Sequence, residues 1–249
     1  MSGRLGVVVV VAIFIVPGTI DAGWQDLIES VTGVAESGRD RSLDSLSEPE
    51  MVAGLKEALS VGSQRAIKLL GTKGGFLNDH SVRIPLPNAL QQVEKGLRVI
   101  GQGAVADEFI ATMNHAAERA VPATASIFGN TIKKMTLKDA QGIIRGADDA
   151  ATRYFRNQSG EQLTQAILPI VKQATEKVGV TSAYKNMVNK AGFLGGLVDG
   201  QNLDLDSYIT EKTLDGLFLK LANEEKLIRQ NPMARSTELL QKVFATADR

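Results

Sequence analysis

The sequence predicts an all-α fold, a single compact domain of about nine helices. Apolar residues recur at intervals of three and four positions, for example at Leu214, Leu217, Phe218 and Leu221, and this spacing lines one face of a helix. Alternating apolar and polar runs longer than four residues, which would indicate half-buried strands, are almost absent. The chain has 249 residues, of which 43% are hydrophobic, so it can bury one sizeable core.

Residues 1–22 have the pattern of a secretory signal peptide. Arg4 provides a positive charge, residues 5–16 form an apolar run, and Ala22 is a small residue at a suitable cleavage point. The run is shorter than the roughly 20 residues that cross a bilayer. We therefore expect cleavage after Ala22, export to the bacterial periplasm, and no transmembrane span in the mature chain.

The mature chain divides at a polar segment. Residues 23–48 are expected to form a short amphipathic helix and a linker, and residues 49–249 to form the helical domain. Ser47 and Glu50 have the spacing of a capping box, in which the two side chains satisfy backbone N–H groups of the first turn. A long helix should begin at this box and end at Gly71.

A second capping-box pattern predicts a helix boundary later in the chain. Tyr154 and Phe155 are expected to close one helix, and Ser159 with Gln162 to cap the next. Pro169 lies inside the helical segment that follows Ser159, so we expect a kink or a further helix boundary there.

The C-terminal part of the chain predicts two more helices. The stripe that contains Leu214 should end at Asn231, because Pro232 cannot continue a helix. A final stripe follows, which consists of Leu239, Leu240, Val243 and Phe244.

The hexapeptide VRIPLP, residues 82–87, interrupts the helical pattern. Its two prolines fix their own φ angles and favour extended geometry in the residues before them. Its three aliphatic side chains then point to one side and Arg83 to the other. We expect a stiff Pro-rich strap whose apolar edge packs on the core and sets the angle of the helix from Asn88. In the alternative hypothesis, Arg83 belongs to a recognition edge.

Composition excludes several kinds of site. The chain has no cysteine, which excludes disulfides, thiol catalysis and Cys-based zinc sites. It has two histidines, too few for a three-His metal site. Lys plus Arg and Asp plus Glu each number 28, so no net charge attracts nucleic acid. We therefore expect no metal, no cofactor and no nucleic-acid partner.

Two short motifs resemble known ligand sites but lack the required context. Gly101-x-Gly103-x-x-Ala106 matches the dinucleotide-binding pattern, which needs a preceding strand, yet the residues before it are spaced as a helix. We interpret it as a joint between two helices. Asp204 and Asp206 lack the remaining ligands of a calcium loop and are interpreted as the start of a helix.

Polar residues beside apolar stripes are the candidates for a functional site. Asn114 and Glu118 are four residues apart and share a helix face, with His115 on the next stripe. Asp148 and Arg153 form an acid–base group before an aromatic pair. A further acid–base pair, Glu225 with Arg229, is interpreted as a surface ion pair. The candidate ligand or partner residues are Arg83, Asn114, His115, Glu118, Asp148, Arg153, Tyr154 and Tyr208.

Several segments together resemble a family of exported proteins of Gram-negative bacteria that is known as a domain of unknown function. The segments are VRIPLP (82–87), MNHAAERAVP (113–122), MTLKDAQGIIRG (135–146), AATRYF (150–155) and the run from Tyr208 to Phe244. The resemblance covers roughly residues 50–247. It implies an exported helical domain, with no catalytic residue or cofactor to carry over.

The sequence contains no recognisable catalytic constellation, so we expect a non-enzymatic binding or interaction protein of the cell envelope. Its partner would be an apolar or amphipathic ligand or another envelope protein. Two alternatives stay open: a hydrolase-like enzyme with an acid–base site around His115, and a purely structural envelope component. A closed apolar cavity of about 300 Å³ would favour ligand binding, and a cleft that holds His115 beside a carboxylate would favour catalysis.

Overall fold

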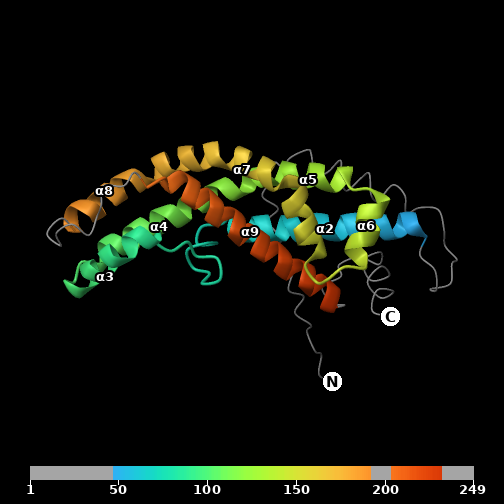
Figure 1. Cartoon of the computed structure of the whole chain (residues 1–249), viewed down its shortest axis with the longest axis horizontal. Helices are drawn as coiled ribbons and strands as arrows, with labels where there is room; N and C mark the ends of the chain where they lie inside the picture. Colours follow the sequence, from blue (N-terminus) through green and yellow to red (C-terminus); the bar gives the residue numbers. More distant parts are fainter. Residues whose placement is uncertain (1–46, 192–202, 232–249) are drawn as a thin grey trace, which may run out of the picture.

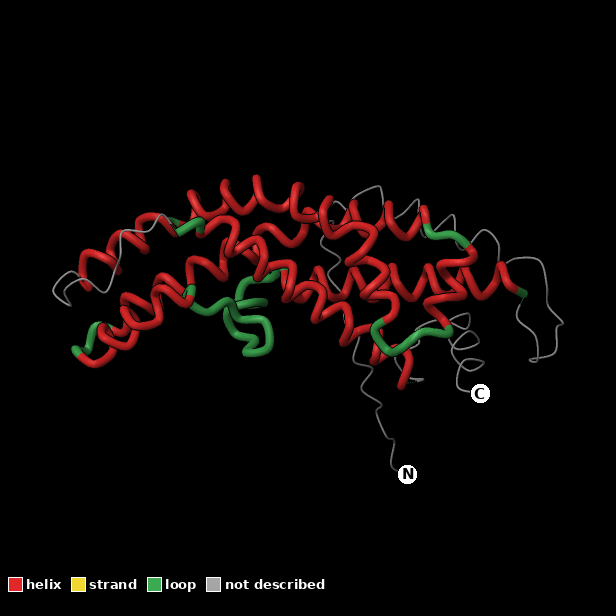
Figure 2. Tube along the Cα trace, viewed as in Figure 1, coloured by secondary structure: helices red, strands yellow, loops and turns green. Residues whose placement is uncertain are grey.

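The computed structural model describes residues 47–191 and 203–231, and every regular element in these two ranges is a helix (Figure 2). The all-α prediction is therefore confirmed. The predicted signal peptide, the residues before Ser47 and the last predicted helix lie outside the described ranges, and the total of about nine helices stays a prediction. The elements are α2 (Glu48–Leu70), η1 (Asn88–Leu90), α3 (Gln91–Val99), α4 (Gly103–Ala120), η2 (Val121–Thr124), α5 (Ala125–Lys134), α6 (Leu137–Ile144), α7 (Ala150–Val178), α8 (Val180–Ala191) and α9 (Leu205–Gln230).

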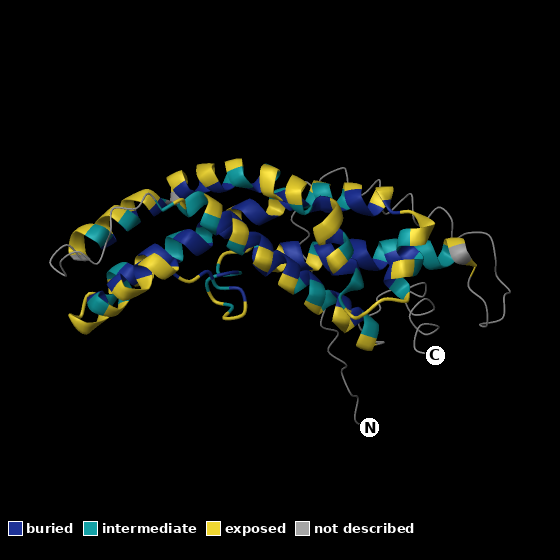
Figure 3. Cartoon of the chain, in the orientation of Figure 1, coloured by how far each residue is buried: buried dark blue, intermediate teal, exposed yellow. Residues whose placement is uncertain are grey.

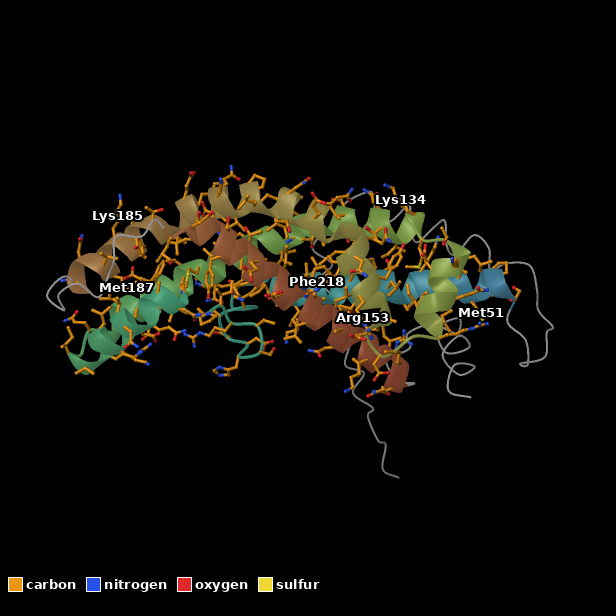
Figure 4. All side chains as sticks on the ribbon, viewed as in Figure 1. Met51, Lys134, Arg153, Lys185, Met187 and Phe218 are labelled. Carbon is orange, nitrogen blue, oxygen red and sulfur yellow. The ribbon has the colours of Figure 1, made fainter. Side chains whose placement is uncertain are left out.

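The helices form an elongated body rather than the compact one expected (Figure 1). At one end α2 packs against α5 and α6, and at the other α3 and α8 pack against α4. Met51 on α2 and Met187 on α8 mark these two ends (Figure 4). The long helices α4, α7 and α9 contact one another between them, and α9 also packs on α2. The shape is elongated because three helices of 18 to 29 residues connect the two ends.

The buried faces of the helices point toward one another along this whole length, and the exposed faces point outward (Figure 3). A single cluster of buried apolar side chains extends from α2 to α9. Small residues allow close helix contacts, since Ala106, Ala116, Ala117 and Ala120 on α4 are all fully buried. Within the described residues, no helix combines the length and apolar character that crossing a membrane requires.

Helix starts follow the predicted caps. The Ser47 N–H donates to the Glu50 carboxylate over 2.8 Å, which confirms the capping box of α2. Thr136 and Asp139 form a second box at α6, and hydrogen bonds from Thr136 lower the pKa of Asp139. Asp204 accepts the Ser207 N–H at the start of α9, as expected for an acid at a helix N-terminus.

The predicted boundary at Ser159 is wrong. α7 continues from Ala150 to Val178, and Ser159 is buried in its middle, where its hydroxyl donates to the Phe155 carbonyl one turn back. Pro169 lies inside the same helix on an exposed position, so solvent can satisfy the carbonyl that loses its partner there. Packing against α4 and α9 stabilises a continuous helix where the local pattern indicates two.

The glycine motif forms a joint, as predicted. α3 ends at Val99, Gly101 has a φ of 77°, and α4 begins at Gly103. A left-handed residue between two helices is a position that glycine adopts without strain. The preceding element is a helix rather than the strand that a dinucleotide site needs.

The strap, residues 82–87, has no regular secondary structure after the turn at Val82 and lies on the core. Val82, Ile84 and Leu86 are 6%, 1% and 1% exposed, which confirms the predicted apolar edge. Arg83 is partly exposed, and among the described residues it forms no ion pair. Immediately after the strap, η1 begins at Asn88 and leads into α3. The strap therefore connects the turns that follow α2 to η1 and α3, with its three aliphatic side chains buried on the core.

Gly216 on α9 should be required for the close packing of α9 against Phe76 and the strap residue Val82. A Cβ atom there would lie 2.7 Å from a ring carbon of Phe76 and 3.2 Å from Cβ of Val82. We expect Gly216→Ala to destabilise the fold by about 1–3 kcal/mol through overpacking, less the roughly 0.5–1 kcal/mol that alanine contributes to a helix.

Gly160→Ala is the matched control for this substitution. Gly160 is also inside a long helix, but no atom lies within 4 Å of its Cβ position. Urea denaturation should show a lower midpoint for the Gly216 variant and an equal or higher midpoint for the Gly160 variant. Equal midpoints for the two variants would contradict the close contact.

Candidate functional site

Asn114 holds the strap on α4. Its side-chain oxygen accepts the Ile84 N–H over 2.8 Å, and its amide group donates to the Ile84 carbonyl over 2.9 Å and to the Ile110 carbonyl over 2.7 Å. The residue is completely buried. Backbone outside helices and sheets lacks regular partners for its N–H and C=O groups. Asn114 supplies a partner to each of these two groups of Ile84.

Glu118, one turn further along α4, holds the turn segment before the strap, residues 71–81. One carboxylate oxygen accepts the Phe76 N–H over 3.1 Å and the Leu77 N–H over 3.2 Å. The other oxygen lies 2.8 Å from Nδ1 of His115. The Glu118 side chain is 5% exposed and that of His115 is 31% exposed, so the imidazole covers a buried carboxylate.

This histidine–carboxylate pair has the spacing of an acid–base pair. Glu118 is, however, the only hydrogen-bond partner of the His115 side chain among the described residues, and no hydroxyl group contacts the imidazole there. Because the other oxygen of Glu118 accepts two backbone N–H groups, the pair organises the turn segment.

α9 holds the same part of the chain from the other side. The Lys220 ammonium lies 2.5 Å from the Asp79 carboxylate and donates to the Ser81 hydroxyl over 2.9 Å. The hydrogen bond from Lys220, with a second one from Ser81, lowers the pKa of Asp79 from its ordinary value of 3.8 to about 2. The Tyr208 hydroxyl donates to the Pro85 carbonyl over 2.9 Å.

Four of the eight predicted candidates therefore converge on the segment from 71 to 87. They are Asn114, His115, Glu118 and Tyr208. Arg83 belongs to that segment. Their common role in the structure is to hold irregular backbone against two helices.

The remaining candidates lie at a separate corner, formed by α6, the start of α7 and the end of α9. Asp148 accepts a hydrogen bond of 2.9 Å from the Gln230 amide. Arg153, labelled in Figure 4, pairs with Asp149 within the first turn of α7. Burial raises the pKa of Tyr154, whose hydroxyl bonds to Asp139. The structure does not bring these residues together with the group on α4.

Glu225 and Arg229 are the residues whose role the sequence did not show. The interpretation as a surface ion pair is wrong, since their side chains are 6% and 11% exposed. The Glu225 carboxylate accepts the Ala151 and Thr152 N–H groups over 2.8 and 2.9 Å, at the first turn of α7. The Arg229 guanidinium donates to the Ile143 carbonyl over 2.8 Å, at the last turn of α6.

One ion pair on α9 therefore caps the end of one helix and the start of the next. A signal for this was present in the sequence. Glu225 continues the apolar stripe of α9, four residues after Leu221 and three before Ile228, so it shares their buried face.

The larger spaces on the described surface are open grooves. A space of about 300 Å³ lies between α7 and α9, with Leu168, Leu214 and Phe218 among its lining residues. Arg156 and Asp215 also line this groove, and the Arg156 guanidinium lies 3.5 Å from the Asp215 carboxylate. The same guanidinium stacks 4.5 Å from the centre of the Phe218 ring. The more enclosed spaces hold only about 20 and 40 Å³. Within the described ranges, no group of three His, Cys, Asp or Glu side chains could hold a metal ion.

The fold and these contacts define an all-helical domain in which buried polar side chains fasten irregular backbone and helix ends. The family model described as "Protein of unknown function (DUF4197)" matches residues 45–245, and the chain belongs to this family. The match confirms the resemblance found in the sequence. No curated protein and no solved structure matches the chain.

Removal of the Asn114 amide should weaken the fold. Asn114→Ala leaves the buried N–H and C=O of Ile84 without their partners, and we expect a loss of about 1–3 kcal/mol in the free energy of unfolding. Asn130→Ala is the control, because Asn130 is exposed on α5. A urea titration of both variants measures the difference. An Asn114 variant as stable as the Asn130 variant would show that the hydrogen bonds of Asn114 to Ile84 contribute nothing to the stability of the fold.

The Asp79–Lys220 pair should make stability depend on pH. The folded-state pKa of Asp79 lies below its ordinary value, so the stabilisation is complete above about pH 4 and is lost as the pH falls toward 2. The free energy of unfolding of the natural chain minus that of Asp79→Asn should therefore shrink between pH 6 and pH 3. Lys220→Gln should remove the same pH-dependent part, since Lys220 is the main cause of the shift. A constant difference across this range would contradict the assignment.

Proposed function

We propose that this chain is a non-enzymatic binding protein of the bacterial cell envelope. Its binding surface is the α7–α9 groove, lined by Arg156, Gly160, Thr164, Leu168, Glu211 and Asp215 with parts of Leu214 and Phe218. Its partner is an amphipathic segment of another envelope protein. The observation that carries the proposal is the combination in one open groove of an apolar surface with paired charges along its edge.

The shape of the groove favours a peptide segment over a small enclosed ligand. Sites for small molecules bury most of the ligand surface, whereas the space of about 300 Å³ here is open to solvent. An amphipathic helix fits between two long helices by placing its apolar face on the groove and its polar face in water. Leu168 is partly exposed at this surface and is available for such a contact.

The charges at the groove suit a partner that carries both signs. Asp215 lies between two cations, 3.5 Å from Arg156 and 3.6 Å from Lys212. Lys212 is also 3.7 Å from Glu211. Exposed pairs of this kind contribute little to stability, about 0–1 kcal/mol each, so they can exchange partners at low cost. Their arrangement would orient a bound segment rather than supply most of its affinity.

The use of the buried polar groups also supports a non-enzymatic role. Asn114, Glu118 and Glu225 each accept backbone N–H groups, and these contacts occupy the atoms that acid–base chemistry would need. The hydrolase-like alternative retains one supporting observation, the 2.8 Å contact between His115 and Glu118. It would require a nucleophile from a substrate or from water at the exposed edge of the imidazole.

Photo-crosslinking from the groove tests the proposal. A photoreactive phenylalanine analogue at position 160 points into open space, and position 142 on α6 offers a matched exposed helical glycine outside the groove. In cells of the source bacterium we expect an adduct of one discrete mass from position 160 and none of that mass from position 142.

A second substitution in the groove gives the specificity control. Leu168→Glu places a charge on the apolar surface and should abolish the adduct from position 160 while leaving the urea midpoint nearly unchanged. Identical adducts from both positions, or none from position 160, would contradict the proposal. Absence of any adduct would favour the structural-component alternative.

A further inference from the structure

A second apolar surface lies at the opposite end of the molecule from α8. It is a small, partly enclosed groove between the start of α2 and α6, lined by Met51, Val52, Leu137, Gln141, Ile144 and Arg145. Leu137 is 44% exposed although it is a large aliphatic residue. The space of about 40 Å³ suits the end of one side chain rather than a small-molecule ligand. An apolar side chain of an amphipathic helix could pack into this space and contact its lining residues.

The end of α9 lies close to this groove. Arg229 donates to the Ile143 carbonyl over 2.8 Å, and Gln230 donates to Asp148 over 2.9 Å, so the last turn of α9 is fastened beside the end of α6. Asn231 is extended, with φ −119° and ψ 105°, because Pro232 disfavours a helical residue before it. The chain therefore leaves the axis of α9 next to α6.

The residues that follow carry a complementary stripe. In the segment 232–249, Leu239, Leu240, Val243 and Phe244 recur at helical spacing with polar residues between them. As a helix, the twelve residues 233–244 would span about 18 Å, and α6 is about 12 Å long. The stripe can therefore reach the whole groove from Pro232. The family match continues to residue 245 and includes all four apolar residues.

We infer that the C-terminal segment, residues 232–249, docks on the α2–α6 groove of its own chain through Leu239, Leu240, Val243 and Phe244. The docked segment covers Leu137 and Ile144 and closes the end of the core where α2 begins. The alternative occupants are the amphipathic stripe within residues 24–31 and a second copy of the chain. The family match begins at residue 45, which disfavours residues 24–31 as part of the shared domain.

Cysteine cross-linking tests this docking in the full-length chain. The natural sequence has no cysteine, so introduced pairs report without background. Leu137→Cys is combined in turn with Cys at Val243 and at Ala245. These two positions have nearly the same tether length, but a helix places Ala245 on the face opposite the stripe. The rate of intramolecular disulfide formation is followed by mass spectrometry and by gel mobility under dilute conditions.

We expect Leu137→Cys/Val243→Cys to cross-link within one chain about tenfold faster than Leu137→Cys/Ala245→Cys, because only the former holds the two thiols at contact distance. The single variants control for folding and for intermolecular pairing. Equal rates for the two pairs would overturn the docking. Predominant cross-linked dimers would indicate a second copy instead, and faster pairing of Leu137→Cys with a Cys at Ile28 would indicate the N-terminal stripe; either result overturns the inference.

Discussion

The buried pair of Glu225 and Arg229 is the interaction on which the arrangement of the helices most depends. The link between α6 and α7 is exposed, but Ile143 in the last turn of α6 and Ala151 and Thr152 in the first turn of α7 are buried. Water has little access there to the backbone groups that helix ends leave unpaired. A carboxylate accepts N–H groups at the start of α7, and a guanidinium donates to carbonyls at the end of α6. Both come from one turn of α9, so this corner fixes three helices relative to one another. Because each charge is paired and hydrogen-bonded, the cost of burying it is offset.

The same principle applies at the strap, where irregular backbone rather than a helix end is buried. Asn114 and Glu118 on α4 provide partners for the backbone of Ile84, Phe76 and Leu77, and α9 adds Lys220 and Tyr208. Loops usually run over the surface because their backbone needs water. Here Asn114, Glu118 and Tyr208 pair with that backbone in place of water, and Lys220 pairs with the side chains of Asp79 and Ser81. Polar groups that resemble a reaction centre in the sequence therefore serve the architecture.

Two grooves between helices lie away from these buried polar contacts. The α7–α9 groove combines an apolar surface with ion pairs at its edge, and the α2–α6 groove lies beside the point at which the chain leaves α9. We assign the first to a partner and the second to the chain itself. The division follows from chain connectivity, since only the second groove lies next to a fastened end of α9 followed by an amphipathic segment.

The sequence by itself determined the helical class, the capping box of α2, the joint at Gly101 and the apolar edge of the strap. Each of these depends on residues within a few positions of one another, and local backbone preferences decide them. It also placed Asn114 and Glu118 on one face of a helix, but not what that face holds.

Only the tertiary structure decided the rest. Ser159 has the local pattern of a cap, yet packing of α7 against α4 and α9 makes it an interior residue. Glu225 and Arg229 have the pattern of a surface pair, yet their partners lie 73 to 86 positions away in the sequence. Short-range patterns contain no record of which helix ends will meet. The physical reason is that burial, which makes an unpaired backbone group costly, exists only once the helices have packed.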